Sequence, residues 1–318
     1  MSAPPVSPAE TPAETKPIRQ PGDRVFAGLA QGAGIVILLV LAGVAAFLII
    51  QAIPALFAPP DQLPGGQNVI VYVAPLVFGT LLSSFIALVL ATPLAVAVAL
   101  FITHFAPRRL AQGLGYLIDL LAAVPSIVFG LWGVGVLAPA SLGVMTWLND
   151  YLGWIPFFAG PVSATGRTMF VVGITLAVMI LPIITAVSRE VFLQTPRLHE
   201  EAALALGATR WEMIRMAVLP FGRSGIVSGA MLGLGRALGE TMAVAIILSG
   251  SGAITFNLIS SNNPSSIAAN IALQFPDSTG LAVNTLIASG LVLFIITLAV
   301  NSLARYIVNR RREFSGAN

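Results

Sequence analysis

Apolar residues gather in long stretches along the chain, separated by shorter polar segments. Six of these stretches are long enough to cross the hydrocarbon core of a bilayer, which takes about 20 helical residues. They cover residues 26–53, 72–103, 112–138, 168–188, 220–249 and 281–307. Several exceed the minimum length, so we expect helices that tilt or extend beyond the bilayer. The pattern predicts an all-α membrane protein with six transmembrane helices.

The two ends of the chain lie outside this pattern. Residues 1–24 are mostly polar and begin rich in Pro, Ala, Thr and Glu, which predicts a disordered cytoplasmic tail. This polar stretch precedes an apolar run too long for a signal core, so a secretory signal peptide is a poor fit. Residues 25–312 form the predicted transmembrane domain, and residues 313–318 a short C-terminal tail.

Basic residues mark alternate connections between the predicted spans. They flank the first span, follow the second and sixth, and are most frequent between the fourth and fifth, at Arg189, Arg197, Arg210, Arg215 and Arg223. The loop after the first span and the loop after the fifth have none, and the long loop after the third has only Arg167. Because cytoplasmic loops carry the excess of Lys and Arg, both termini and loop 195–218 are predicted to be cytoplasmic.

Composition agrees with a polytopic membrane protein and excludes several kinds of site. The chain is 57% hydrophobic and 9% charged, whereas a soluble domain carries roughly 25% charged residues. It has no cysteine, and its histidines, His104 and His199, are far apart, so no metal site is expected. Lys16 is the only lysine, which makes a phosphate-binding loop ending in Gly-Lys-Ser/Thr impossible. We therefore expect no cofactor here; if ATP is used, it binds with Mg on a partner.

The cytoplasmic segment 195–218 is predicted to form two short helices that project as a compact knob. Thr195 and Pro196 suit the N-cap and first position of a helix, and Gly207 is a natural stop. Thr209 and Glu212 have the spacing of a capping box, which predicts a second helix running toward Pro220. Such a segment fits either a partner's groove or the membrane surface.

The fifth span carries charges of both signs. Arg236 and Glu240 are four residues apart, so on a continuous helix they share a face and can pair. A charge inside the membrane usually faces the bundle interior or a cavity. Two interpretations of Arg236 and Glu240 follow. They form a neutralised ion pair that holds helices together, or they line the path of a transported anion. Small residues recur every four positions on the same predicted helix, which favours close packing: Gly225, Gly229, Gly233 and Ala237.

Two further features have weaker signals. Asp119 lies within the third span and is either a packing or water-facing residue or a secondary pathway residue that pairs with Arg236 in one conformation. The outer loop 139–167 is rich in aromatic residues, which favour the interface between membrane and water. We expect a short helix or re-entrant turn in this loop, serving as an ordinary interfacial loop or as a docking surface or gate.

The loop before the fifth span resembles the EAA motif of ABC importer permeases. The matching residues are Glu201-Ala202-Ala203, then Gly207 after three residues, then Leu219-Pro220, with Ala217 where isoleucine is usual. This resemblance implies a type I ABC importer permease fold. It also implies that Glu201, Ala202, Ala203 and Gly207 belong to a coupling helix that sits in a cleft of an ATPase subunit.

A second resemblance concerns the charged run itself. Residues 233–244, GLGRALGETMAV, and residues 122–130 around Val124-Pro125 are similar to the PstC-type permeases of phosphate-specific ABC transporters. The resemblance implies inorganic phosphate as cargo, with Arg236 and Glu240 as the family's arginine and glutamate. It also implies a second, PstA-type permease, two PstB-type ATPases and an external PstS-type phosphate-binding protein as partners.

Other functions are weighed against this one. The same architecture could import molybdate, sulfate or an amino acid, and the EAA-like loop does not separate these cargoes. A membrane-embedded enzyme would need clustered polar catalytic groups near one interface, and the sequence offers none. The chain is therefore expected to be a transport subunit without catalytic residues, in the cytoplasmic (inner) membrane of a prokaryote.

Overall fold

The computed structural model describes residues 21–312, so residues 1–20 of the predicted tail 1–24, the predicted tail 313–318 and the only lysine lie outside it. Residues 21–24, predicted to be disordered, belong to the first turn of a helix. Contacts divide the chain into two units, residues 1–47 and residues 48–318. The first unit holds the start of α1 (Pro21–Phe57), and all later helices belong to the second. The described residues contain no β-strand, only an isolated bridge between Gly250 and Asn263.

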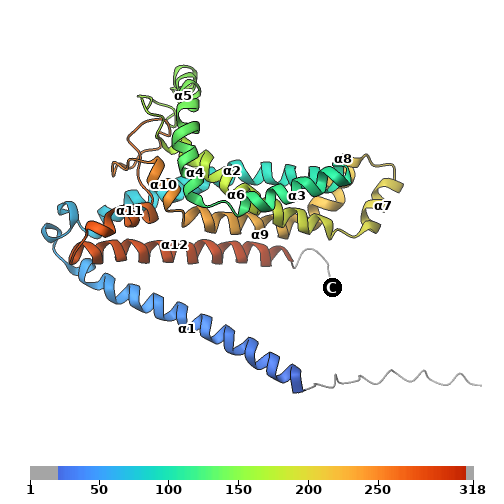
Figure 1. The fold of residues 1–318 in the computed structure, drawn as a ribbon, viewed down its shortest axis with the longest axis horizontal. Helices are drawn as coiled ribbons and strands as arrows, with labels where there is room; N and C mark the ends of the chain where they lie inside the picture. Colours follow the sequence, from blue (N-terminus) through green and yellow to red (C-terminus); the bar gives the residue numbers. More distant parts are fainter. Residues whose placement is uncertain (1–20, 313–318) are drawn as a thin grey trace, which may run out of the picture. The chain divides into compact units, whose positions relative to one another are not determined.

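Most helices of the second unit follow one another with short connections, and the two long connections are residues 153–168 and 248–266 (Figure 1). In order the helices are α2 (Val69–Leu100), α3 (Arg108–Ala122), α4 (Ser126–Trp132), α5 (Ala138–Leu152), α6 (Met169–Leu193), α7 (Arg197–Ala205), α8 (Arg210–Met213), α9 (Leu219–Leu238), α10 (Met242–Ile247), α11 (Ile267–Gln274) and α12 (Leu281–Arg312). Helices α7 and α8 lie toward one end of α6, and α5 and α10 toward the other (Figure 1).

Six helical segments of the described residues are long and apolar enough to cross a membrane, as predicted. They run over Val25–Phe57, Val69–Phe105, Ser126–Leu152, Met169–Leu193, Arg210–Leu238 and Leu281–Tyr306. The first, second, fourth and sixth agree closely with the expected spans. The third and fifth differ, and both differences arise from a break in the helix. The cytoplasmic location of the termini stays a prediction.

The expected third span, 112–138, is interrupted at its centre. Helix α3 ends at Ala122 and α4 begins at Ser126, with Pro125 between them in an extended conformation. Proline has no backbone donor and disfavours helical geometry in the residue before it, so Val124 and Pro125 end the helix. The membrane-length segment instead joins α4 to α5 through a π-helical turn at Gly133–Leu137. Half of the expected outer loop, 139–167, is therefore helix.

The expected fifth span, 220–249, is also discontinuous. Helix α9 ends at Leu238, and the six-residue helix α10 begins at Met242. Gly239 and Thr241 flank Glu240 at the break, where three glycines within seven residues lower the helical propensity of the segment. The prediction of one continuous helix over 220–249 was wrong, and this changes the geometry of both charged residues.

The fourth span, α6, lies at the centre of the packed helices. In the most apolar 18-residue stretch of α6, 61% of the residues are buried. The corresponding values are 33% for the span that contains α2 and 28% for the span that contains α9. Helices α2 and α9 both pack against α6. The predicted small-residue stripe of α9 is confirmed as this contact, because Gly225, Gly229, Gly233 and Ala237 are all buried. Because the glycines of α9 have no Cβ, side chains of α6 fill the space beside them: Val191, Val187 and Ile184.

This packing predicts that Gly225→Ala destabilises the folded chain. A Cβ at Gly225 would lie 2.2 Å from a methyl carbon of Val191 and 2.7 Å from its Cβ, so the helices must move apart. Overpacking of this kind typically costs about 1–3 kcal/mol. The control is Gly235→Ala on the same helix, where the added carbon meets nothing within 4 Å. The melting temperature of the purified protein should fall for Gly225→Ala but not for Gly235→Ala. Equal melting temperatures for the two variants would contradict the close contact.

Candidate functional site

The EAA-like segment folds as the sequence predicts at its end but not at its start. Helix α7 ends in a Schellman motif: the Gly207 amide donates to the Leu204 carbonyl at 3.0 Å and the Ala208 amide to the Ala203 carbonyl at 3.2 Å. Gly207 has φ +87°, a conformation that favours glycine. The predicted N-cap was wrong, because Pro196 is extended, α7 begins at Arg197, and the buried Thr195 hydroxyl caps nothing.

The predicted capping box is present. The Glu212 carboxylate accepts from the Thr209 backbone amide at 2.8 Å, and the Glu212 amide donates to the Thr209 hydroxyl at 3.3 Å. Helix α8 begins there and continues through a π-helical turn, Ile214–Val218, into α9. The EAA-like segment is therefore joined directly, as helix, to the span that carries Arg236.

Helix α7 exposes nearly all of its side chains. It has no buried residue, and Glu201, Ala202 and Gly207 are exposed, whereas Ala203 is half-buried against a small core cluster at the end of α2. Leu198 and Leu206 are 74% and 90% exposed. An exposed helix with both acidic and apolar positions is a surface that a protein groove or a membrane interface can cover.

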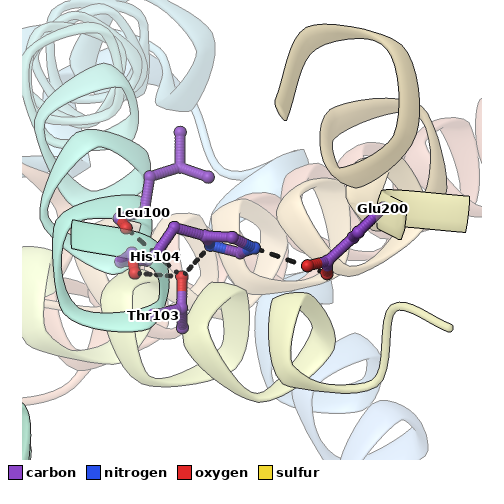
Figure 2. A network of polar contacts seen from close by, with 5 residues as sticks. Leu100, Thr103, His104 and Glu200 are labelled. Carbon is purple, nitrogen blue, oxygen red and sulfur yellow. Dashed lines mark hydrogen bonds and ion pairs between the residues drawn. The ribbon is translucent and has the colours of Figure 1, made fainter. Parts of the chain in front are cut away.

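One polar contact ties α7 to the second span. Glu200 Oε1 lies 3.6 Å from His104 Nε2, and the other ring nitrogen of His104 lies 2.6 Å from the Thr103 hydroxyl (Figure 2). Thr103 in turn donates to the Ala99 carbonyl at 2.9 Å. His104 belongs to a π-helical turn, Phe101–Phe105, that extends α2. A displacement of α7 would therefore act directly on the end of α2.

The other half of the site lies where the third and fifth spans are broken. A Cβ on Gly130 would lie 2.9 Å from the Ala243 Cα, so α4 and α10 pack backbone to backbone. This contact brings the two breaks together. Residues 122–130 and 233–244, which are distant in the sequence, thus form one structural region.

Arg236 is half-buried on the last turn of α9 and reaches across to the third span. Its Nη1 donates to the carbonyl of Ala122, the last residue of α3, at 3.4 Å. The final carbonyls of a helix lack partners within it and carry partial negative charge, so a guanidinium is favourable there. This hydrogen bond is long, and Arg236 forms no ion pair with any described residue. Its other donors are thus available to a ligand.

Glu240 is 7% exposed and lies in the break itself. Its Oε1 accepts from the Ala243 amide at 3.1 Å, which satisfies a free donor at the start of α10. The expected sharing of one helix face by Arg236 and Glu240 was wrong, because α9 ends between them. Among the described residues the two side chains form no ion pair. Each instead serves the end of a different helix.

Arg167 is a residue whose position the sequence reasoning missed. Its Nε donates to the Ile247 carbonyl at 3.1 Å and its Nη2 to the Ile246 carbonyl at 2.6 Å. These are the last carbonyls of α10, so charged side chains satisfy both ends of this short helix. The available signal was that Arg167 is the lone basic residue of a loop that the charge bias places outside.

Asp119 is exposed on α3 and forms no ion pair in the described part of the chain, so the structure does not bring it into contact with Arg236. Two pockets lie elsewhere. One of about 370 Å³ is lined mainly by leucine and phenylalanine side chains of α2 and α9, and one of about 450 Å³ by the loops around Val162 and Asn257. Neither has a charged lining residue, so neither suits an anion.

The chain is similar to a known family of membrane transport proteins. The family model described as the binding-protein-dependent transport system inner membrane component matches residues 91–313. That range contains α7, Arg236 and Glu240. The chain belongs to this family. It is therefore a multi-pass protein of the inner membrane and a transport component.

Curated relatives of this transport family match nearly the whole chain. The phosphate transport system permease protein PstC 2 of Mycobacterium tuberculosis is 46% identical over 96% of this chain and 98% of the relative. The PstC protein of Mycobacterium leprae is 48% identical over 84% of this chain and 87% of the relative. The PstC protein of Mesorhizobium japonicum is 36% identical over 93% of this chain and 92% of the relative.

Solved structures show the same fold at low sequence identity. A bacterial ABC transporter that imports the acidic polysaccharide alginate matches with a TM-score of 0.56 and 15% identity, over 90% of this chain and 99% of that chain. The inward-facing methionine transporter MetNI matches with a TM-score of 0.51 and 15% identity, over 76% and 95%. The predicted ABC importer permease fold is confirmed.

The cap at α10 leads to a prediction about Glu240. Glu240→Gln keeps an oxygen acceptor for the Ala243 amide, whereas Glu240→Ala leaves that amide without one. Loss of an N-terminal cap costs about 0.5–2 kcal/mol. We expect a lower melting temperature for Glu240→Ala than for Glu240→Gln in the purified protein. If the glutamine variant is the less stable of the two, the capping role is wrong.

Proposed function

We propose that this chain is a permease subunit of an ATP-driven importer that moves inorganic phosphate inward by alternating access. The observation that carries the proposal is Arg236, a half-buried guanidinium at the meeting point of two broken helices with a single long hydrogen bond. The names of relatives that align over most of this chain support phosphate as the cargo. A guanidinium offers forked donors that match the oxygens of a phosphate.

The same geometry favours release of the anion as well as its capture. Phosphate binding at Arg236 competes with only one carbonyl contact, at 3.4 Å. Glu240 adds a negative charge close by in the sequence, which limits how tightly a dianion is held. Passage through a membrane requires binding strong enough to enter and weak enough to leave. Arg236 and Glu240 together meet both requirements, with Asp119 as a secondary pathway residue.

Energy for transport comes from partner subunits in this proposal. The chain cannot form the lysine-containing phosphate-binding loop of an ATPase, so ATP and Mg bind elsewhere. The exposed α7, with Glu201, Ala202, Ala203 and Gly207, docks on an ATPase of PstB type. A homologous PstA-type permease completes the pathway, and a PstS-type binding protein delivers phosphate from outside. Helix α7 passes the movement of the ATPase to α9 through α8, and to α2 through His104.

The cargo role is tested by Arg236→Gln. This change removes the charge and shortens the side chain but keeps an N–H donor, so the assembled complex should form while uptake of labelled phosphate falls by about tenfold or more. The measurement uses cells that lack their own phosphate importer and express this chain with its partners. Uptake of labelled molybdate and sulfate is measured in parallel. Normal phosphate uptake by the assembled variant would refute the role, and uptake of another anion in place of phosphate would reassign the cargo.

The docking role is tested by Gly207→Trp and Glu201→Lys, which alter the exposed surface of α7. Both should reduce co-purification of the ATPase with the permease, because bulk or reversed charge prevents entry into a groove. Thr146→Val, at an exposed site of α5 on the opposite end of α6, is the control and should change nothing. Unaltered ATPase recovery in both α7 variants would favour a helix that rests on the membrane surface.

A further inference from the structure

Arg189 is a second guanidinium in a membrane-capable helix whose charge no described residue balances. It lies near the end of α6, just past the end of the span predicted from the sequence. Its Nε is enclosed and has no hydrogen-bond partner, and no carboxylate of the described residues lies within ion-pair distance of it. The charge bias predicts that Arg189 lies at the cytoplasmic end of α6, where an unpaired guanidinium can meet a soluble anion or a lipid headgroup.

The guanidinium of Arg189 packs against the backbone of α3. A Cβ placed on Gly115 would meet Arg189 Nη1, and the flexible guanidinium would then have to move aside. In the structure the charge of Arg189 therefore lies at the surface of α3.

Helix α3 aligns this charge with Arg236. Gly115 and Ala122 are seven residues apart, which places them on the same helix face about 10 Å apart along the axis. Arg189 lies against the first, and Arg236 donates to the carbonyl of the second. Asp119 lies between them on the same helix and is exposed. In the sequence of α3, Asp119 thus lies between the two residues that the arginines contact.

We propose that Arg189 forms a second position for a phosphate-type oxyanion, about two helical turns from Arg236 and nearer the end of the molecule that carries α7. Forked guanidinium donors against bare backbone suit a tetrahedral oxyanion. The oxyanion is either free phosphate in transit or the headgroup of a phospholipid, and the two sources share this chemistry. The identification of the free anion as phosphate rests on the proposed function.

A cysteine placed between the two arginines reports on this position. This chain has no cysteine, so Asp119→Cys introduces the only thiol of this subunit, and its modification is read from the mass of this subunit. The assembled complex in phospholipid nanodiscs is treated with anionic and with cationic methanethiosulfonate reagents, with and without inorganic phosphate. A nearby positive charge raises the rate with the anionic reagent and lowers the rate with the cationic one. Adding Arg189→Gln should therefore lower the anionic-to-cationic rate ratio severalfold, and Arg223→Gln, at an exposed site of α9, should not.

The effect of phosphate separates the two sources. For a free anion, phosphate slows modification of the thiol, and this protection is lost with Arg189→Gln but kept with Arg236→Gln. For a lipid headgroup, phosphate has no effect, and the Arg189→Gln complex retains fewer phospholipids in native mass spectrometry. An unchanged rate ratio in Arg189→Gln, or protection that depends on Arg236 alone, would overturn the inference. The rate ratio remains informative even if the complex fails to take up phosphate, so failure of the proposed function is recognised separately.

Discussion

A backbone group inside a membrane must have a hydrogen-bond partner, and the charged residues of this chain follow from that constraint. Two of its spans are broken, which leaves free carbonyls at the end of α3 and free amides at the start of α10. Arg236 donates to the first, Glu240 accepts from the second, and Arg167 donates to the carbonyls at the far end of α10. Each charge also has the sign that the dipole of its helix end favours.

This arrangement unites the two readings that the sequence left open for Arg236 and Glu240. They are structural, because each satisfies a helix end, but they do not neutralise each other as an ion pair. A charge held by a backbone dipole keeps more of its field than one held by an opposite charge. Arg236 can therefore stabilise α3 in the absence of an anion and turn toward one without breaking a salt bridge.

Sequence reasoning succeeded at most local patterns, although the predicted N-cap at Thr195 was wrong. The stop at Gly207, the capping box of Thr209 and Glu212, and the small-residue face of α9 all depend on residues within a few turns. It failed at the two breaks, because hydropathy averages over a span and does not register that Gly239 or Pro125 ends a helix. The contacts of Arg167 and Arg189 join residues more than 70 positions apart, and no pattern within either segment contains them.

In the proposed function, the break between α9 and α10 allows one helix both to receive the movement of the ATPase and to contact the anion. Helix α8 and a π-helical turn connect α7 to α9, which remains helical up to Leu238 and carries Arg236 on its final turn. Helix α9 packs on α6 through glycines, and side chains of α6 fill the gaps that these glycines leave. A small movement of α7 would then shift Arg236 relative to Ala122, whereas α10 is held by Glu240 and Arg167. In the proposed transport cycle, the break at Gly239 would separate the part that moves from the part that stays.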